Sequence, residues 1–294
     1  MFTLKLENEN GEVLTLTQAQ DRYQVLDIQG LNPPNATIYQ SEVSGMDGTK
    51  EMSKKLGTRN LVILVRINGA VERNRLKLYN FAKTKHYCKV WYKNGSRDVY
   101  IEGTVETNEC PLFTNSEQMQ ISIICSDPYF QSVEEIVTDV SQVLGNFEFP
   151  FAFGADGVEE GTTTDEAIEF SVYIENRIVN VVNEGEDDTG LIIRITATGR
   201  VVNPTIYNVA TREAFSLKIT MEKSDVLTIN TGRGRKSVKL LHGTTLSNCI
   251  NKVVRESTWL NLAKGDNLFT YDADEETASS MNVVFTHRTK YQAV

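Results

Sequence analysis

The sequence contains few of the residues from which metal sites and redox sites are built. Only four cysteines and three histidines occur in 294 residues. No two cysteines have the C-x-x-C spacing of a zinc ribbon or a redox pair, so neither motif is present. The histidines His86, His242 and His287 are isolated, and their spacing indicates no metal site. Cys88 and Cys125 lie in apolar segments, where we expect buried thiols.

Long apolar runs and catalytic motifs are also absent. No run reaches the roughly 20 apolar residues that span a bilayer. Residues 1–7 alternate as a strand does and lack the apolar block of a signal peptide, so we expect no membrane partner and synthesis in a cytoplasm. No Gly-x-Ser-x-Gly, His-Glu-x-x-His or phosphate-binding glycine loop occurs. The sequence therefore predicts a protein that is not an enzyme and that holds no cofactor or metal.

Charge is distributed unevenly along the chain. Residues 1–133 carry equal numbers of basic and acidic side chains, whereas residues 134–188 carry one basic and fifteen acidic ones. Residues 189–294 carry fourteen basic and nine acidic side chains. The length favours two domains, and Pro128 ends a strand just before the change in charge. We therefore predict domains at 1–133 and 134–294.

The acidic clusters permit two chemical interpretations besides a solvated surface. A glycosidase needs two carboxyl groups about 5–10 Å apart across a sugar cleft, and calcium needs six or more oxygen ligands. The spacing establishes neither arrangement, so we interpret the clusters as solvated loops. They are Asp165-Glu166 with Glu169, Asp187-Asp188, and Asp272 with Asp274-Glu275-Glu276.

Two small basic clusters, residues 50–55 and 233–236, have no RNA-binding aromatic pattern beside them. In an acidic chain they predict no sequence-specific binding of nucleic acid.

The first part of the chain alternates between strand and turn signals. Residues 2–7 and 12–16 form an expected hairpin around Asn10-Gly11, and further strands are expected at 23–28, 61–67, 87–92, 99–105 and 121–125. Residues 71–83 have helical spacing. The stretch 38–55 is almost entirely polar after Tyr39 and cannot bury itself in its own core. It is either a flexible loop or a hairpin that reaches a neighbour, and composition alone does not decide between them.

The second part of the chain is also rich in short strands. They are expected at 167–174, 178–183, 191–198, 214–221, 226–229, 237–241, 257–262 and 282–287, while 244–254 is ambiguous. Short strands at this spacing indicate a sandwich or barrel. Trp259 is then either a core residue or a platform for stacking on a glycan.

The order of these signals resembles the distal tail proteins of long, non-contractile-tailed bacteriophages and prophages (siphoviruses). Residues 58–131 carry the strand–helix–strand–hairpin–strand order, after polar turns at 31–34 and 44–48. Near the C-terminus the motif Asn-x-Phe-x-Tyr-x-Ala occurs at 267–273, followed by a strand and the basic-aromatic end Arg288-Thr289-Lys290-Tyr291. The resemblance implies a mainly β fold. The N-terminal domain would be a β-sandwich or split barrel with one short helix and a protruding hairpin. The C-terminal domain would be a galectin-like β-sandwich of the kind found in carbohydrate-binding modules.

The same resemblance implies a structural role in the virion, at the tail tip, after synthesis in the cytoplasm of the host bacterium. Residues 1–133 would form a hexameric ring between the tail tube and the adsorption apparatus, and residues 134–294 would anchor peripheral proteins. The implied partners are further copies of the chain in a hexamer or double hexamer, the major tail tube protein, a tail-associated lysin or tail-tip protein, and receptor-binding or other baseplate proteins. The hairpin would act as a belt on the adjacent subunit through Ile38, Tyr39, Val43, Gly45, Met46, Asp47, Gly48 and Met52.

Two other functions remain as alternatives. One is a carbohydrate-binding module for the host wall, with Trp259 as the candidate for stacking on a glycan. The other is a β-sandwich glycoside hydrolase, which only the acidic clusters favour.

Overall fold

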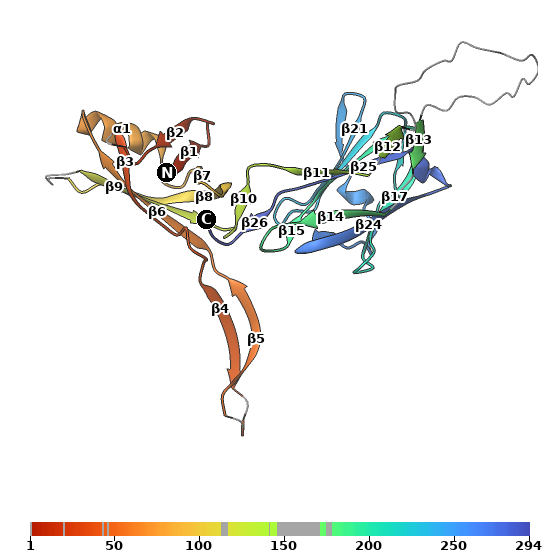
Figure 1. Ribbon diagram of the computed structural model, residues 1–294, viewed down its shortest axis with the longest axis horizontal. Helices are drawn as coiled ribbons and strands as arrows, with labels where there is room; N and C mark the ends of the chain where they lie inside the picture. The colour runs from red at the N-terminus through yellow and green to blue at the C-terminus, as the bar shows by residue number, and fades with distance from the viewer. Residues whose placement is uncertain are drawn as a thin grey trace, which may run out of the picture. The chain divides into compact units, whose positions relative to one another are not determined.

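The computed structural model describes residues 2–19, 21–42, 44–45, 47–112, 117–140, 142–145, 171–174 and 178–294. The described chain is mainly β, with one α-helix, which confirms the expected fold class (Figure 1). It divides into two compact units. Unit 1 comprises Met1–Glu135, Glu184–Asp188 and Arg288–Val294, and unit 2 comprises Ile136–Asn183 and Thr189–His287. Among the described residues, no helix has the length and apolar character needed to cross a bilayer.

Unit 1 is built on a nine-stranded sheet whose main path runs β2-β1-β7-β8-β9-β6-β3, with β10 paired to β8 and to β26. An isolated parallel bridge between Thr17 and Gln24 joins the two ends of this path, so the sheet is a barrel that is almost closed. The strands are β1 (Thr3–Asn8), β2 (Val13–Leu16), β3 (Tyr23–Gln29), β6 (Arg59–Ile67), β7 (Tyr87–Lys93), β8 (Asp98–Glu109), β9 (Gln118–Cys125), β10 (Phe130–Ser132) and β26 (Lys290–Tyr291).

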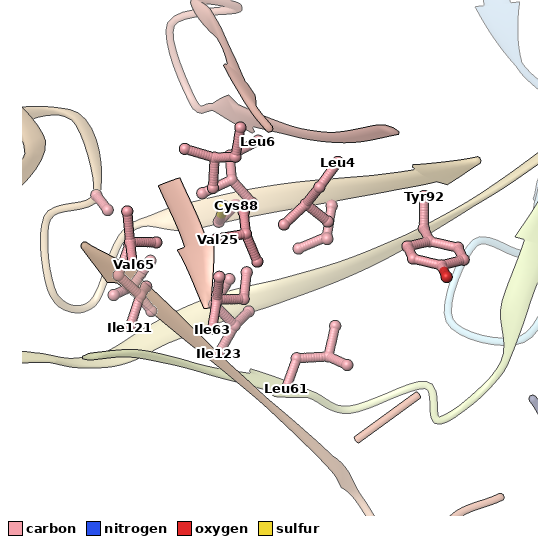
Figure 2. Close-up of a cluster of buried hydrophobic side chains, with 14 of the residues drawn as sticks. Leu4, Leu6, Val25, Leu61, Ile63, Val65, Cys88, Tyr92, Ile121 and Ile123 are labelled. Atoms are coloured by element: carbon pink, nitrogen blue, oxygen red, sulfur yellow. The ribbon is translucent and has the colours of Figure 1, made fainter. Parts of the chain in front are cut away.

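The core of unit 1 follows from alternation along these strands. In β6, Leu61, Ile63 and Val65 are buried while the residues between them are not, because successive side chains point to opposite faces. Each strand of the main path contributes to one apolar cluster, as Figure 2 shows for Leu4, Val25, Cys88 and other members (Figure 2). The single helix α1 (Val71–Phe81) adds Leu78 to this cluster.

At one position of the barrel, neighbouring strands lie so close that only glycine fits. A Cβ atom added at Gly103 in β8 would lie 2.7 Å from the Ile123 side chain, 2.7 Å from the Ile124 carbonyl oxygen and 2.9 Å from the Cys125 sulfur. We expect Gly103→Ala to lower the free energy of unfolding of unit 1 by about 1–3 kcal/mol, because a packed core tolerates added atoms poorly. Urea denaturation measures this loss. Gly95→Ala is the control, since nothing lies within 4 Å of the corresponding position, and an equal loss in both variants would contradict the packing explanation.

A separate two-stranded hairpin leaves unit 1 between β3 and β6. It consists of β4 (Ala36–Glu42) and β5 (Thr49–Leu56), which pair only with each other among the described strands. Figure 1 shows it extending away from the sheet. Of the two forms that composition left open for residues 38–55, the hairpin is correct.

Two later parts of the chain complete unit 1. Lys290 and Tyr291 of β26 pair with Gln131 and Phe130 of β10. In the segment 184–188, the Glu186 amide donates to the Lys290 carbonyl at 2.8 Å, and one Glu186 carboxylate oxygen accepts from Arg97 at 2.6 Å. The two units therefore differ from the linear segments 1–133 and 134–294, because residues 184–188 and 288–294 belong to unit 1.

Unit 2 has two larger sheets that enclose an apolar core containing Val181, Ile195, Phe215, Phe269 and Phe285. The first runs β11-β25-β16-β20-β21-β22 and the second runs β14-β24-β17-β18, with β19 paired to β17. The first sheet contains β11 (Ile136–Asp139), β16 (Ile192–Ala197), β20 (Val226–Asn230), β21 (Ser237–His242), β22 (Thr245–Asn248) and β25 (Met281–His287). The second contains β14 (Ile178–Asn183), β17 (Val201–Asn208), β18 (Ala214–Ser216), β19 (Thr220–Met221) and β24 (Gly265–Asp274). Shorter elements are β12 (Gln142–Gly145), β13 (Ser171–Ile174), β15 (Thr189–Gly190), β23 (Asn261–Leu262), η1 (Ile250–Lys252) and η2 (Thr277–Ser280).

The two longest described strands of unit 2, β17 and β24, were not expected from the sequence. Strand β17 contains Pro204, and a proline within a strand usually argues against that assignment. The register of β17 on β24 shifts between Val202 and Thr205, so the proline occupies an irregularity where it breaks no regular ladder. The motif around Asn267 lies in β24. The prediction of one strand over 214–221 is wrong, because this segment contains two separate short strands, β18 and β19.

Candidate functional site

The hairpin β4–β5 is the part of unit 1 whose side chains have the least contact with its own core. Every residue of β4 is exposed, and so is every residue of β5 except Leu56. Ile38, Tyr39 and Met52 are 53%, 46% and 66% exposed, which is unusual for apolar side chains gathered on one element. Of the other expected belt residues, Gly45, Asp47 and Gly48 lie exposed between the two strands. Val43 and Met46 lie outside the described residues.

Local interactions explain why this polar segment forms a hairpin. Backbone pairing runs from Ala36 opposite Leu56 to Glu42 opposite Thr49, and its register shifts after Tyr39. This shift leaves Met52 unpaired on β5. The Lys55 ammonium lies 5.3 Å from the centre of the Tyr39 ring, a cation–π contact. The hairpin therefore has order from its own ladder while both its faces remain uncovered.

The base of the hairpin is fixed by Arg59, the first residue of β6. Arg59 is 2% exposed, and its guanidinium lies 4.5 Å from the centre of the Phe130 ring. Its Nε donates to the Pro128 carbonyl at 2.7 Å, and its Nη1 donates to the carbonyls of Gly30 and Asn32, the latter at 2.7 Å. One charged side chain thus connects the segment that enters β4 with the segment that follows β9.

The C-terminal segment takes part in the same cluster. Arg59 Nη2 donates to the Gln292 carbonyl at 2.6 Å, and the Val294 amide donates to the Leu31 carbonyl at 3.3 Å. Burial lowers the pKa of Arg59, but an arginine remains protonated, so the charge is satisfied by four backbone carbonyls. We call Arg59 and these four carbonyls the hairpin clamp.

A glycine permits the close packing at the clamp. Gly30 has φ of +89°, and a Cβ atom there would lie 2.2 Å from the Asn60 carbonyl oxygen. Only glycine adopts this backbone conformation without strain at such a short separation. No local sequence pattern predicts the clamp, because its members lie far apart, at positions 30, 32, 59, 128 and 292.

Trp259 in unit 2 is partly buried rather than fully exposed. Its ring packs on Phe215 with centroids 4.9 Å apart, and the Lys236 ammonium lies 5.2 Å from the ring centre. It also contacts the core of unit 2. Trp259 therefore contributes to packing, and its role in stacking on a glycan stays a prediction.

The acidic clusters that the structure describes have ordinary structural partners. Asp187 accepts a hydrogen bond from the Tyr129 hydroxyl, and the pKa of Tyr129 is raised by burial first and by this hydrogen bond second. Asp274 accepts from the Asn203 amide at 2.8 Å, and Glu275 pairs with Arg200 at 2.6 Å. The cluster of Asp165, Glu166 and Glu169 lies outside the described residues. In the part of the chain that is described, no three His, Cys, Asp or Glu side chains converge as a metal site would require.

The thiols of Cys88 and Cys125 are buried, as the sequence predicted. Burial raises the pKa of each to about 12. Neither forms a disulfide. Thiolate chemistry at neutral pH is therefore suppressed at both positions.

A groove of about 480 Å³ lies on unit 1 beside Trp91. The Trp91 ring N–H donates to the Glu7 carboxylate at 2.9 Å, and Lys93 pairs with Asp98 at 2.7 Å. Glu7, Lys93 and Asp98 are thus engaged with neighbours, and the residues that line the groove form no arrangement of acid, base and nucleophile.

A buried histidine makes the stability of unit 2 depend on pH. His287 at the end of β25 is buried, and this burial lowers its pKa, although a backbone contact with Val182 acts in the opposite direction. Because the unfolded chain binds a proton more readily, His287 reduces stability as the pH falls below its unfolded pKa of about 6.5.

We expect His287→Phe to weaken the acid sensitivity of unit 2, by at most about 1.4 kcal/mol per pH unit. The measurement is the free energy of unfolding of wild type and variant between about pH 7.5 and pH 5. Parallel curves for the two proteins would show that His287 does not titrate on unfolding.

Solved structures of phage tail and baseplate proteins have a fold similar to that of this chain. One similar solved structure is the Dit protein (gp 19.1) of phage SPP1, described as a paradigm of the hub adsorption apparatus in phages that infect Gram-positive bacteria. It has 12% sequence identity and a TM-score of 0.68, with 99% of each chain covered. The baseplate of phage P2 in its activated conformation is also similar, with 12% identity and full coverage of both chains. Its TM-scores are 0.57 for the form with Ca and 0.58 for the form with Sr.

A comparison of sequence with family models agrees with the fold. Residues 184–291 match the family described as siphovirus-type tail component, C-terminal domain. No curated protein matches the chain. The resemblance to distal tail proteins of siphoviruses that the sequence indicated is therefore confirmed.

Proposed function

We propose that this protein is a structural hub of a siphovirus tail tip, located in the virion between the tail tube and the adsorption apparatus. In this proposal unit 1 forms a ring of six copies, alone or as two stacked rings, and unit 2 anchors peripheral proteins. The role requires no catalytic residue. It requires a head-to-tail contact surface that closes after six copies.

The observation that carries the proposal is the exposed hairpin with a fixed base. Ile38, Tyr39 and Met52 remain 46–66% exposed in the single chain, so a partner that covers them gains the stabilisation of burying this apolar surface. The hairpin clamp holds the base of β4 and β5 in one place, which reduces the conformational entropy lost when the hairpin binds. A neighbouring copy is the partner that a repeated ring contact provides, and the similarity to tail-hub proteins supports this choice.

The other proposed partners follow from the position of a tail hub. They are the major tail tube protein on one side, a tail-associated lysin or tail-tip protein on the other, and receptor-binding or other baseplate proteins around unit 2. Six weak attachment points on one ring act together through avidity.

Light scattering after size-exclusion chromatography tests the ring directly. We expect a mass of six or twelve times 33.0 kDa, with rings in negative-stain images. A protein that remains a monomer at all attainable concentrations and forms no rings would overturn the proposal.

A further inference from the structure

The outward face of the second sheet in unit 2 is unusually apolar. In a β-sandwich the outward positions normally carry polar side chains, while the inward ones form the core. In strand β14 the inward Val181 is buried, but the outward Ile178 and Val182 are exposed as well. The apolar residues on this face are between 38% and 58% exposed. They are Ile178, Val182, Tyr207, Val209 and Leu268.

Strand register places these side chains side by side. Ile178 of β14 lies opposite Thr270 of β24, and Thr270 lies opposite Tyr207 of β17. In the next row Leu268 lies opposite Asn180, and the Val209 amide donates to the Leu268 carbonyl at 2.8 Å. The residues therefore form one patch across three strands, which we call the β14 face.

The charge on the β14 face has one sign. The five strands of this sheet contain three aspartates, Asp266, Asp272 and Asp274, and no lysine or arginine. Asp266 and Asp272 are exposed, and Asp266 accepts from the Asn180 amide at 2.7 Å. The outward face of the other sheet differs, because it exposes Arg194 and Lys239.

The charge and the apolar rows of the β14 face restrict the class of partner that can bind there. An acidic face repels nucleic acid and anionic membrane surfaces, and it attracts basic groups. Exposed apolar rows along strands fit an extended segment whose alternate side chains point toward the sheet. An apolar patch with charges of one sign is typical of a specific contact rather than of an ordinary solvated surface.

We propose that the β14 face docks an extended segment of another tail protein, in which every second side chain is apolar and lysine or arginine flanks this apolar run at both ends. The inference rests on the proposed hub function, since it names the surface of unit 2 that anchors a peripheral protein. The apolar side chains of the segment cover Ile178, Tyr207 and Leu268. Its basic side chains lie beside Asp266 and Asp272.

The test uses the full-length protein and two labelled synthetic peptides of about ten residues, which is near the upper limit of usual strand lengths. In both peptides valine alternates with threonine, and the residues at the two ends are lysine in one peptide and glutamate in the other. Fluorescence anisotropy measures their binding to wild type, to Ile178→Ser/Leu268→Ser and to Asp266→Asn/Asp272→Asn. Leu246→Ser is the matched control, because Leu246 is 61% exposed on the other sheet.

We expect the lysine peptide to bind wild type at least about ten-fold more tightly than the glutamate peptide. Each double variant should weaken the binding of the lysine peptide by about ten-fold, and Leu246→Ser should leave it within about two-fold. Equal binding of both peptides, no binding of the lysine peptide, or an equal loss in the control would overturn the inference.

The size of the variants in solution separates this inference from the hub function. If the double variants lose peptide binding but still form rings, both proposals stand. If the double variants alone fail to form rings, the β14 face is a contact between copies of this chain, and the docking inference is wrong while the ring stands. If wild type binds the lysine peptide as expected but never forms rings, the docking face stands and the hub function falls.

Discussion

Replacing Arg59 with methionine is expected to abolish ring formation and to destabilise unit 1 by at least about 3 kcal/mol. Methionine has a similar length but no donors. The substitution leaves the carbonyls of Gly30, Asn32, Pro128 and Gln292 without the charged partner that satisfies them in the native protein. The base of the hairpin then loses its fixed position. The measurements are urea denaturation and light scattering on the same preparations.

Two further variants interpret the result. Arg59→Lys keeps the charge but reaches fewer carbonyls, because an ammonium lacks the planar fork of a guanidinium. Its free energy of unfolding and its extent of ring formation should lie between those of wild type and Arg59→Met. Arg22→Met removes an exposed arginine of the same unit and should change neither measurement. If Arg59→Met forms rings as wild type does, the hairpin clamp has no part in assembly.

Shortening the hairpin is expected to leave both units folded and to prevent the formation of rings. In this variant residues 38–54 are replaced by Asn-Gly. Thr37 and Lys55 lie opposite each other in the ladder, and Asn-Gly forms the turn type that connects two paired strands through two residues. The removed residues contribute almost nothing buried to unit 1, so we expect the free energy of unfolding to change by less than about 1 kcal/mol. Light scattering should report a monomer.

A milder variant separates loss of the hairpin from loss of its apolar contacts. Ile38→Ser/Tyr39→Ser/Met52→Ser keeps the ladder but removes the exposed apolar surface, and it should weaken assembly strongly, because buried apolar area drives association. Leu246→Ser removes a similarly exposed side chain in unit 2 and should assemble normally. Normal rings from the shortened protein would show that the hairpin is not the belt.

The amino-acid sequence alone determined the type and order of most elements in unit 1. The apolar run at residues 61–67 and the helical spacing from residue 71 are local patterns, and both are visible in the sequence without knowledge of the fold. The same local logic predicted two buried thiols, at Cys88 and Cys125. It also identified residues 38–55 as a segment with no core of its own. It did not predict β17, because the irregular pairing that accommodates Pro204 depends on the strand beside it.

Only the tertiary structure decided how the hairpin is held and what completes unit 1. Four backbone carbonyls from distant parts of the chain meet at Arg59, and backbone carbonyls have no signature in a sequence. A fragment that ends at Ser132 would lack β26 and the Gln292 carbonyl, although the change in charge after residue 133 marks a boundary there. Likewise, the β14 face exists because strand register places Ile178, Tyr207 and Leu268 in one patch. Sequence patterns report which side of each strand is apolar, whereas pairing between strands decides which of those sides become neighbours.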